Sequence, residues 1–308
     1  MTRFVFAGVT ALLLAGAVTR AQAPAPVAQA PIFKSESELV VVHVLVTDRS
    51  GGYVSGLSEK AFALYDETRP QIPKFFLNED APVTVGLVID SSGSMAQARD
   101  RVIAASTEFV KASNPEDEVF ALAFNDEVHP ALGGNSFTSD PAVLGSALAR
   151  AFQPIGRTAL YDAVVEGLEY GSHGMHDRRV LIVVSDGGDN ASDAGLKDVV
   201  TKVQESNTVI YGIAIADRND PDANPKKLKE LAEISGGGFF APEDVNEVRE
   251  VFQKIARDVR HMYTIGFEPM NSAYHSGFHK LRVEVKTTDG RKFSVRSRAG
   301  YLKTHVGP

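Results

Sequence analysis

The most telling absence in this 308-residue sequence is cysteine, of which there is none. Without cysteine the chain has no disulfide bonds, no thiolate metal site and no lipid-modified N-terminal cysteine. Its stability must therefore come from a hydrophobic core, and a chain of this length is long enough to bury one. The composition, 44% hydrophobic and 23% charged, is ordinary for a globular protein.

Positive charge is also scarce. The chain has 32 Lys and Arg against 39 Asp and Glu, which gives a formal net charge of −7. No stretch gathers its Lys and Arg into a basic patch. Because binding to nucleic-acid phosphates needs a basic face, we expect no nucleic-acid partner.

Long hydrophobic runs are absent except at the N-terminus. Residues 4–18 are apolar, follow Arg3, and precede the small-x-small sequence Ala21-Gln22-Ala23. This pattern predicts a signal peptide over residues 1–23, because the apolar run is shorter than the ~20 residues that a membrane-spanning helix needs. We therefore expect an exported protein, periplasmic or extracellular, with no membrane span after cleavage.

The remaining chain divides into four segments by composition and periodicity. Residues 24–37 form a Pro/Ala-rich linker without a core pattern. Residues 38–80 and 261–304 have the alternation and turn residues of short strands, while residues 81–260 alternate apolar strands with helical patterns. Each β segment is too small to hold a core alone, so we expect the two to pair with each other.

The predicted fold class is α/β. Right-handed crossovers would build residues 81–260 into a doubly wound, mostly parallel sheet with helices on both faces, as in Rossmann-like folds. A small β-sandwich made from both chain ends would flank it. The first helix of this region is expected over residues 95–112, and Arg69-Pro70 is expected to separate two short strands.

Residues 83–95 (VTVGLVIDSSGSM) are the stretch with the clearest chemistry. An apolar run typical of a strand buried on both faces ends in Asp90, Ser92 and Ser94. These residues would lie at the carboxyl edge of the sheet, where open α/β sheets bind ligands. One carboxylate and two hydroxyls suit Mg²⁺ or a similar cation. Alternatively, the string only ends the strand and caps the helix.

Two later loops lead to the same edge. Thr158, in the sequence GRTALYDAV, precedes a predicted helix, and Asp186 follows the predicted strand 179–184. Each has a simpler explanation, Thr158 as a helix N-cap and Asp186 as an Asp-Gly turn residue. Together the three loops offer two carboxylates and three hydroxyls that a doubly wound topology can bring together.

These three motifs, in this order, resemble the von Willebrand factor type A (VWA) domain. The resemblance covers about residues 82–260, and the flanking segments VSGLSEKAFALYDETRPQ and VRSRAGYL are similar to those of bacterial secreted VWFA-related proteins. It implies a metal-ion-dependent adhesion site. The implied metal set is Asp90, Ser92, Ser94, Thr158 and Asp186.

The resemblance also implies how such a site acts. The hydroxyls would bind the ion directly, and the aspartates would often act through water. A carboxylate from an Asp or Glu of a protein partner would fill the open coordination position. The expected ion is Mg²⁺, with Mn²⁺ or Ca²⁺ as alternatives, because oxygen sites select poorly among these ions.

Other candidate residues have weaker signals. Asp162 and Asp189 are either supporting residues of the metal site or solvated loop acids. His173 and His176 have the spacing of a zinc pair, but the intervening glycine favours an exposed loop. The acidic stretch 217–222 lacks the spacing of a calcium loop.

We expect a non-enzymatic binding protein, and two alternatives stay open. The first is a Mg²⁺-dependent hydrolase or phosphoryl-transfer enzyme that uses Asp90 and Asp186. Against it, the chain lacks the GxxxxGK[ST] pattern, and the candidate site lacks the DxD pair of aspartyl-phosphate enzymes. The second is a structural envelope component with a stabilising metal. The sequence predicts no particular oligomeric state.

Overall fold

The structure is a computed structural model, and it describes residues 39–78, 80–134, 136–215, 223–269, 276–288 and 290–303. All of these belong to one compact unit, Ser37–Pro308. The predicted signal peptide, the predicted linker and the acidic stretch 217–222 lie outside the described residues. No helix in the described ranges is long and apolar enough to cross a membrane.

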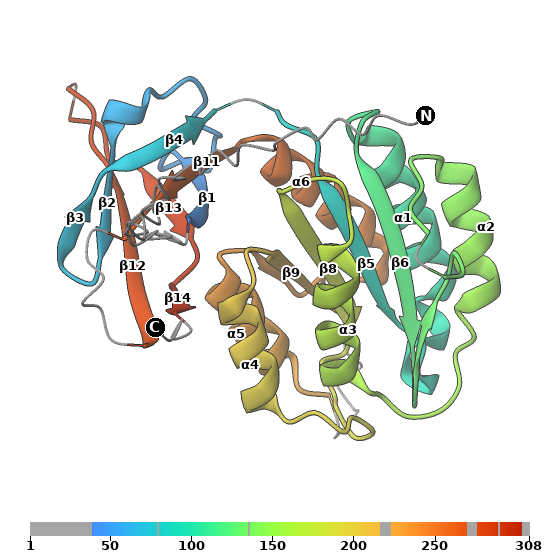
Figure 1. Ribbon diagram of the computed structural model, residues 1–308. Coiled ribbons are helices and arrows are strands. Elements are labelled where there is room, and N and C mark those ends of the chain that lie inside the picture. The colour runs from blue at the N-terminus through green and yellow to red at the C-terminus, as the bar shows by residue number, and fades with distance from the viewer. Residues whose placement is uncertain are drawn as a thin grey trace, which may run out of the picture. The chain divides into compact units, whose positions relative to one another are not determined.

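A six-stranded sheet forms the centre of the α/β region (Figure 1). Its strand order is β10-β9-β8-β5-β6-β7, and only the β6–β7 pair is antiparallel. Every residue of the central strand β5 is buried, as expected for a parallel strand covered on both faces. The strands are β5 (Thr84–Asp90), β6 (Glu118–Phe124), β7 (Val128–Pro130), β8 (Arg179–Ser185), β9 (Val209–Ala214) and β10 (Phe239–Phe240).

Helices cover both faces of this sheet. One hydrophobic cluster joins β5 residues such as Leu87 and Ile89 to helices α1, α2 and α6, and a second joins Val88 to α3, α4 and α5. The predicted doubly wound fold class is therefore confirmed. The helices are α1 (Arg99–Ala112), α2 (Pro141–Ala151), α3 (Leu160–Ser172), α4 (Leu196–Glu205), α5 (Pro225–Ser235) and α6 (Val248–Arg260), with 3-10 helices η1 (Glu59–Ala61), η2 (Gly93–Gln97) and η3 (Val245–Glu247).

Two antiparallel sheets contain strands from both ends of the chain. Their strand orders are β13-β1-β11-β4 and β14-β12-β2-β3, so each sheet joins strands that precede and follow the α/β region. A third hydrophobic cluster, which includes Val42, Phe62 and Tyr263, lies between them. The strands are β1 (Val40–Thr47), β2 (Phe62–Asp66), β3 (Arg69–Gln71), β4 (Pro73–Leu77), β11 (Met262–Phe267), β12 (Gly277–Val285), β13 (Ser294–Ser297) and β14 (Gly300–Lys303).

One local prediction was right in part and another was wrong. The helix expected over residues 95–112 is confirmed over α1, but its first residues belong to the separate 3-10 helix η2, which buries Met95 in the core. Arg69 and Pro70 do not separate strands but belong to β3. This strand lies at a sheet edge, where a residue without an N–H group costs no ladder hydrogen bond.

A buried carboxylate, Asp258, connects helix α6 to the β-sandwich. Its Oδ2 accepts a hydrogen bond from Nη2 of Arg296 at 2.6 Å, and its Oδ1 accepts one from the Tyr53 hydroxyl at 2.5 Å. Lys254 lies 3.3 Å from the same carboxylate. Tyr53 and Arg296 come from opposite ends of the chain, so this one side chain ties both ends to the last helix of the α/β region.

Asp258→Ala should lower the free energy of unfolding by about 3 kcal/mol or more, because it leaves Arg296 without its charged partner in a largely buried position. Urea denaturation measures this. Asp100→Ala is the control, since Asp100 is 92% exposed in its ion pair with Arg99 and should change stability by less than about 1 kcal/mol. Equal losses in the two variants would contradict the role assigned to Asp258.

The buried His43 predicts a specific acid sensitivity. Burial, helped by the positive charges of Arg178 and Arg298, lowers the pKa of His43 from 6.5 to about 3. Between these values the unfolded chain binds a proton that the folded chain does not, so stability falls as the pH falls from 6.5 towards 3.

His43→Gln should remove this component. At about pH 4.5 it amounts to about 3 kcal/mol, at 1.36 kcal/mol per pH unit. Denaturation at about pH 7 and about pH 4.5 should therefore show a smaller pH effect in His43→Gln than in the wild type. His173→Gln, which changes an exposed histidine, is the control and should keep the wild-type profile. An unchanged profile in His43→Gln would refute the prediction.

Candidate functional site

The loop after the central strand β5 begins with a fully buried carboxylate. Asp90 is the last residue of β5, and its Oδ1 accepts a hydrogen bond from the Ser92 backbone N–H at 2.8 Å. Its Oδ2 accepts one from the Ser185 hydroxyl at 2.6 Å. Ser185 ends the neighbouring parallel strand β8, so strand pairing places this hydroxyl beside Asp90.

A chain of side-chain oxygens extends from this loop to the loop after β8. The hydroxyls of Ser92 and Ser94 lie 3.1 Å apart, and Ser94 donates a hydrogen bond to Oδ2 of Asp186 at 2.7 Å. The other oxygen of Asp186 accepts from the Gly188 N–H at 2.8 Å. The structure thus brings four of the five predicted residues into one hydrogen-bonded group.

Thr158 reaches the same edge through its backbone. Its N–H donates to Oδ1 of Asn190 at 2.9 Å, and its carbonyl accepts from the Asn190 N–H at 2.9 Å. Two residues before Thr158, the Gly156 carbonyl accepts a hydrogen bond from the Gly93 N–H at 3.4 Å. This bond joins the loop of Thr158 to the loop of Ser92 and Ser94. Within the described part of the chain, the Thr158 hydroxyl forms no hydrogen bond with the other four residues.

The electrostatics of the site favour a cation. Burial raises the pKa of the Asp90 carboxyl to about 6, with an added contribution from the nearby Asp186, while hydrogen bonds from Ser185 and Ser92 oppose the rise. Among the described residues, no Lys, Arg or His forms an ion pair with Asp90 or Asp186. Buried carboxylates without a compensating charge are costly, so a cation bound here would stabilise both.

The donor set fits a small, hard cation. Two ligands that meet at right angles about 2.1 Å from Mg²⁺ lie about 3.0 Å apart. The Ser92–Ser94 and Ser94–Asp186 separations of 3.1 and 2.7 Å are close to this value. Among the residues that the structure describes, no group of three or more His, Cys, Asp or Glu could hold a metal ion, so a site here depends on its hydroxyls.

Asp162 and Asp189 hold a neighbouring loop in place. Asp162 accepts hydrogen bonds from the N–H groups of Asp193 and Ala194 at 2.8 and 2.9 Å. Asp189 accepts one from the Ser192 hydroxyl at 2.6 Å. Both aspartates therefore order residues 189–194 against the start of α3.

Sequence reasoning missed two supporting residues, Ser185 and Asn190. Ser185 orients Asp90, and its place at the end of an apolar strand beside Asp186 was a usable signal. Asn190 fixes the Thr158 backbone through a tertiary contact that no local pattern indicates.

The histidine pair considered for zinc is part of a surface loop. Nε2 of His176 lies 2.9 Å from the Glu116 carbonyl oxygen. His173 is exposed and lines a shallow acidic cleft with Glu166 and Glu169. Neither the position of His173 nor the contact of His176 favours a zinc site.

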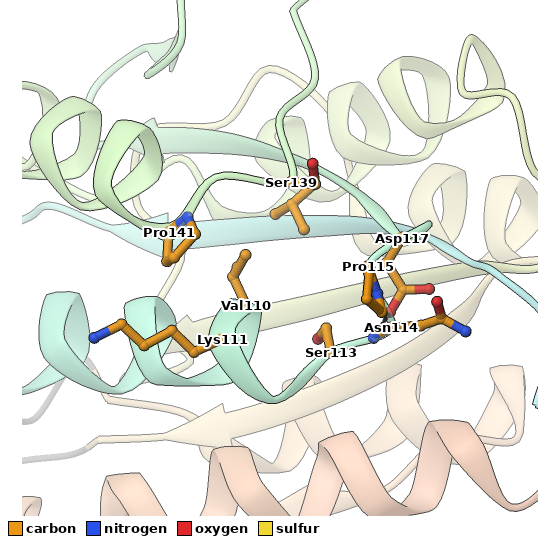
Figure 2. Close-up of a pocket in the computed structure, with 9 residues that line it drawn as sticks. Val110, Lys111, Ser113, Asn114, Pro115, Asp117, Ser139 and Pro141 are labelled. Atoms are coloured by element: carbon orange, nitrogen blue, oxygen red, sulfur yellow. Dashed lines mark hydrogen bonds between the residues drawn. The ribbon is translucent and has the colours of Figure 1, made fainter.

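A separate cavity lies beside the start of β6, between the end of α1 and the start of α2. It has a volume of about 280 Å³, and Figure 2 shows Lys111 and Ser113 near the end of α1 opposite Pro141 at the start of α2. Its one carboxylate, Asp117, already accepts hydrogen bonds from the N–H groups of Val83 and Asn114. This cavity contains none of the predicted site residues.

Comparison with known proteins identifies one family. The model of the von Willebrand factor type A domain matches residues 84–254, more than half of the chain. No curated protein sequence matches.

Several solved structures are similar to part of this chain. A von Willebrand factor type A protein from Catenulispora acidiphila has 14% identity and a TM-score of 0.51, over 80% of this chain and 74% of that one. A mutant of the PilB minor pilin from Streptococcus sanguinis has 10% identity and a TM-score of 0.50, over 60% and 63%. The vWF domain of the type V pili tip protein Mfa5 from Porphyromonas gingivalis has 18% identity and a TM-score of 0.49, over 58% and 95%.

Gly156→Ala should destabilise the loop beside the site by about 1–2 kcal/mol. Gly156 has a φ of +87°, and an added Cβ would collide with the Asp126 carboxylate, which also accepts the Arg157 N–H. Chemical denaturation measures the loss. Gly93→Ala is the matched control, because a Cβ there meets nothing within 4 Å. If both variants were equally stable, the strain assigned to Gly156 would be disproved.

Proposed function

The chain belongs to the von Willebrand factor type A domain family, and from this premise we propose that it is an exported, non-enzymatic protein that binds a protein partner through a divalent cation. The observation that carries the proposal is the oxygen chain Ser92–Ser94–Asp186 beside the buried carboxylate of Asp90, which has no Lys, Arg or His ion-pair partner among the described residues. Protein binding is a common role of this domain family.

In this proposal the cation is Mg²⁺, with Mn²⁺ or Ca²⁺ as substitutes. Ser92, Ser94 and Asp186 hold it, Thr158 adds a hydroxyl from the neighbouring loop, and Asp90 supplies charge while it orients the Ser92 backbone. The bound cation would supply an electrophilic centre that attracts an anionic ligand. An Asp or Glu carboxylate of the partner is the ligand that fits.

The hydrogen bonds of the site support binding over catalysis. Within the described part of the chain, the hydroxyls of Ser94 and Ser185 donate to carboxylates, and none of the serines of this site contacts a histidine base. Nucleophilic catalysis by serine needs such a base within hydrogen-bond reach. The proposed export rests on the N-terminal signal pattern of residues 1–23.

Mg²⁺ and Mn²⁺ should raise the unfolding temperature of the mature protein. A ligand that binds only the folded state stabilises it by about 2.7 kcal/mol at a hundredfold excess over its dissociation constant. Ser94→Ala should lose most of this shift and still fold, because Ser94 is exposed. Asp126→Asn, on a neighbouring loop outside the predicted set, is the control and should respond like the wild type.

The outcomes separate the candidate functions. A shift that is lost in Ser94→Ala and kept in Asp126→Asn supports the cation site. No shift in the folded wild type would count against the whole proposal. Turnover of phosphoester substrates by the metal-loaded protein, lost in Ser94→Ala, would favour the enzyme alternative instead.

A further inference from the structure

His43 and Arg178 are two buried side chains, and each has a polar atom without a hydrogen-bond partner. His43 is 6% exposed and Arg178 is 5% exposed. Nε2 of His43 and Nη1 of Arg178 are both buried, and within the described ranges neither atom forms a hydrogen bond. Buried polar atoms in folded proteins almost always have a partner, so this pair points to a bound ligand.

The two side chains meet where the sandwich contacts the α/β region. His43 belongs to β1 and faces Thr264 on the paired strand β11, whereas Arg178 immediately precedes β8 of the central sheet. The Arg178 carbonyl accepts a hydrogen bond at 2.9 Å from the N–H of Thr84, the first residue of β5. The pair therefore lies at the amino end of the central strands, whereas the candidate metal site lies at their carboxyl end.

A single hydroxyl, that of Thr264, joins the two side chains. Its Oγ1 lies 3.1 Å from Nδ1 of His43 and accepts a hydrogen bond from Nη2 of Arg178 at 3.0 Å. Because Arg178 can only donate, the Thr264 hydrogen is free for Nδ1, which leaves the ring hydrogen of His43 on Nε2. Each unpartnered nitrogen is one carbon removed from a nitrogen that contacts Thr264. Two N–H donors are thus held beside one hydroxyl.

The charge around this pair is positive. At about pH 7 His43 is neutral, because burial and the charges of Arg178 and Arg298 lower its pKa to about 3. Arg298 is 6% exposed, and neither arginine forms an ion pair with any residue that the structure describes. Arg296, by contrast, has the Asp258 carboxylate at 2.6 Å. Buried guanidinium groups without a carboxylate partner are costly, and a bound anion would offset this cost.

Two carboxylates act on Arg178 without pairing with it. Asp80 and Asp117 raise the pKa of Arg178, but burial has the larger effect and holds this pKa below its ordinary value of 12.5. Each carboxylate has another partner. Oδ2 of Asp80 lies 2.5 Å from Nη1 of Arg260, and Asp117 accepts hydrogen bonds from two backbone N–H groups. Neither therefore neutralises the guanidinium group of Arg178.

We propose that Nε2 of His43 and Nη1 of Arg178 bind a chloride ion between the sandwich and the α/β region. Chloride carries the required charge, accepts hydrogen bonds and donates none, so it suits two N–H donors beside uncompensated arginines. Because both side chains are almost completely buried, the site suits a small monovalent anion and not a large organic anion. The ion joins β1 to the start of β8. This site is separate from the proposed cation site and does not depend on it.

Urea denaturation at about pH 7 tests the inference, with sodium chloride exchanged for sodium gluconate at constant ionic strength. Above the dissociation constant of the ion, each tenfold rise in chloride should increase the ratio of folded to unfolded protein about tenfold. Sodium bromide should act as sodium chloride does, because bromide is also a compact monovalent anion. Stability that does not depend on chloride at any concentration would overturn the inference.

The variants are Arg178→Met and Arg282→Met. Arg178→Met removes the charge and the N–H donors but keeps a long apolar side chain, and it should lose the dependence on chloride. The Arg282 side chain, on β12, is 51% exposed, so Arg282→Met controls for the loss of an arginine and should keep the wild-type dependence. A dependence that survives in Arg178→Met, or that is lost equally in both variants, would contradict the proposed site.

A direct measurement keeps the inference testable even if Arg178→Met fails to fold. Wild-type crystals grown in sodium bromide should show an anomalous scattering peak within hydrogen-bond distance of both Nε2 of His43 and Nη1 of Arg178. A peak at this position supports the inference. Density there without an anomalous signal would identify a water molecule and overturn it, and so would bromide peaks found only at the protein surface.

Discussion

The buried carboxylate of Asp90, which forms no ion pair with a Lys, Arg or His among the described residues, is the constraint on which the rest of the candidate site depends. Asp90 ends the central strand of the sheet, and its two oxygens are held by the Ser185 hydroxyl and the Ser92 backbone. The first contact requires β5 and β8 to be parallel neighbours that end at the same level, and the second requires the chain to turn immediately after the strand. The order of the strands, the tight η2 helix and the serine-rich loop together hold this one negative charge inside the protein. In the proposed function, the same charge would favour a cation bound to the oxygens of Ser92, Ser94 and Asp186.

The second organising contact is between the sandwich and the α/β region. Asp258 on α6 accepts hydrogen bonds from Tyr53 and Arg296. Arg298 donates hydrogen bonds to the Asn207 side chain and the Gln204 carbonyl at 2.9 and 2.7 Å. These contacts involve charged or polar atoms that are largely buried, so they are specific in direction as well as position. The last helix of the α/β region consequently has a fixed relation to both chain ends.

The sequence alone was sufficient for the fold class and for the grouping of Asp90, Ser92, Ser94 and Asp186. Periodicity identified the buried strands, and parallel strands necessarily bring their carboxyl ends to one edge. The remainder depended on tertiary contacts. Pro70 is accommodated in a strand because β3 lies at a sheet edge, and Met95 belongs to a 3-10 helix that buries its side chain in the core. The support that Asn190 gives to Thr158 could be identified only from the structure, in which the two loops lie together.

The interleaving of the two chain ends also determines when the fold can be completed. His43 on β1 faces Thr264 on β11 across a separation of 221 residues, and β1 pairs on its other side with β13. Strand β1 leaves the ribosome early, yet both of its sheet partners are made near the end of synthesis. The α/β region, in contrast, forms its parallel sheet from residues that follow one another closely. The pairing of β1 with β11 and β13 joins residues far apart in the sequence, and pairing of this kind is slow to form. The sandwich is therefore completed last, after the α/β region. A chain truncated before β11 would carry an apolar β1 strand with no sheet to join, and this strand would make it prone to aggregation.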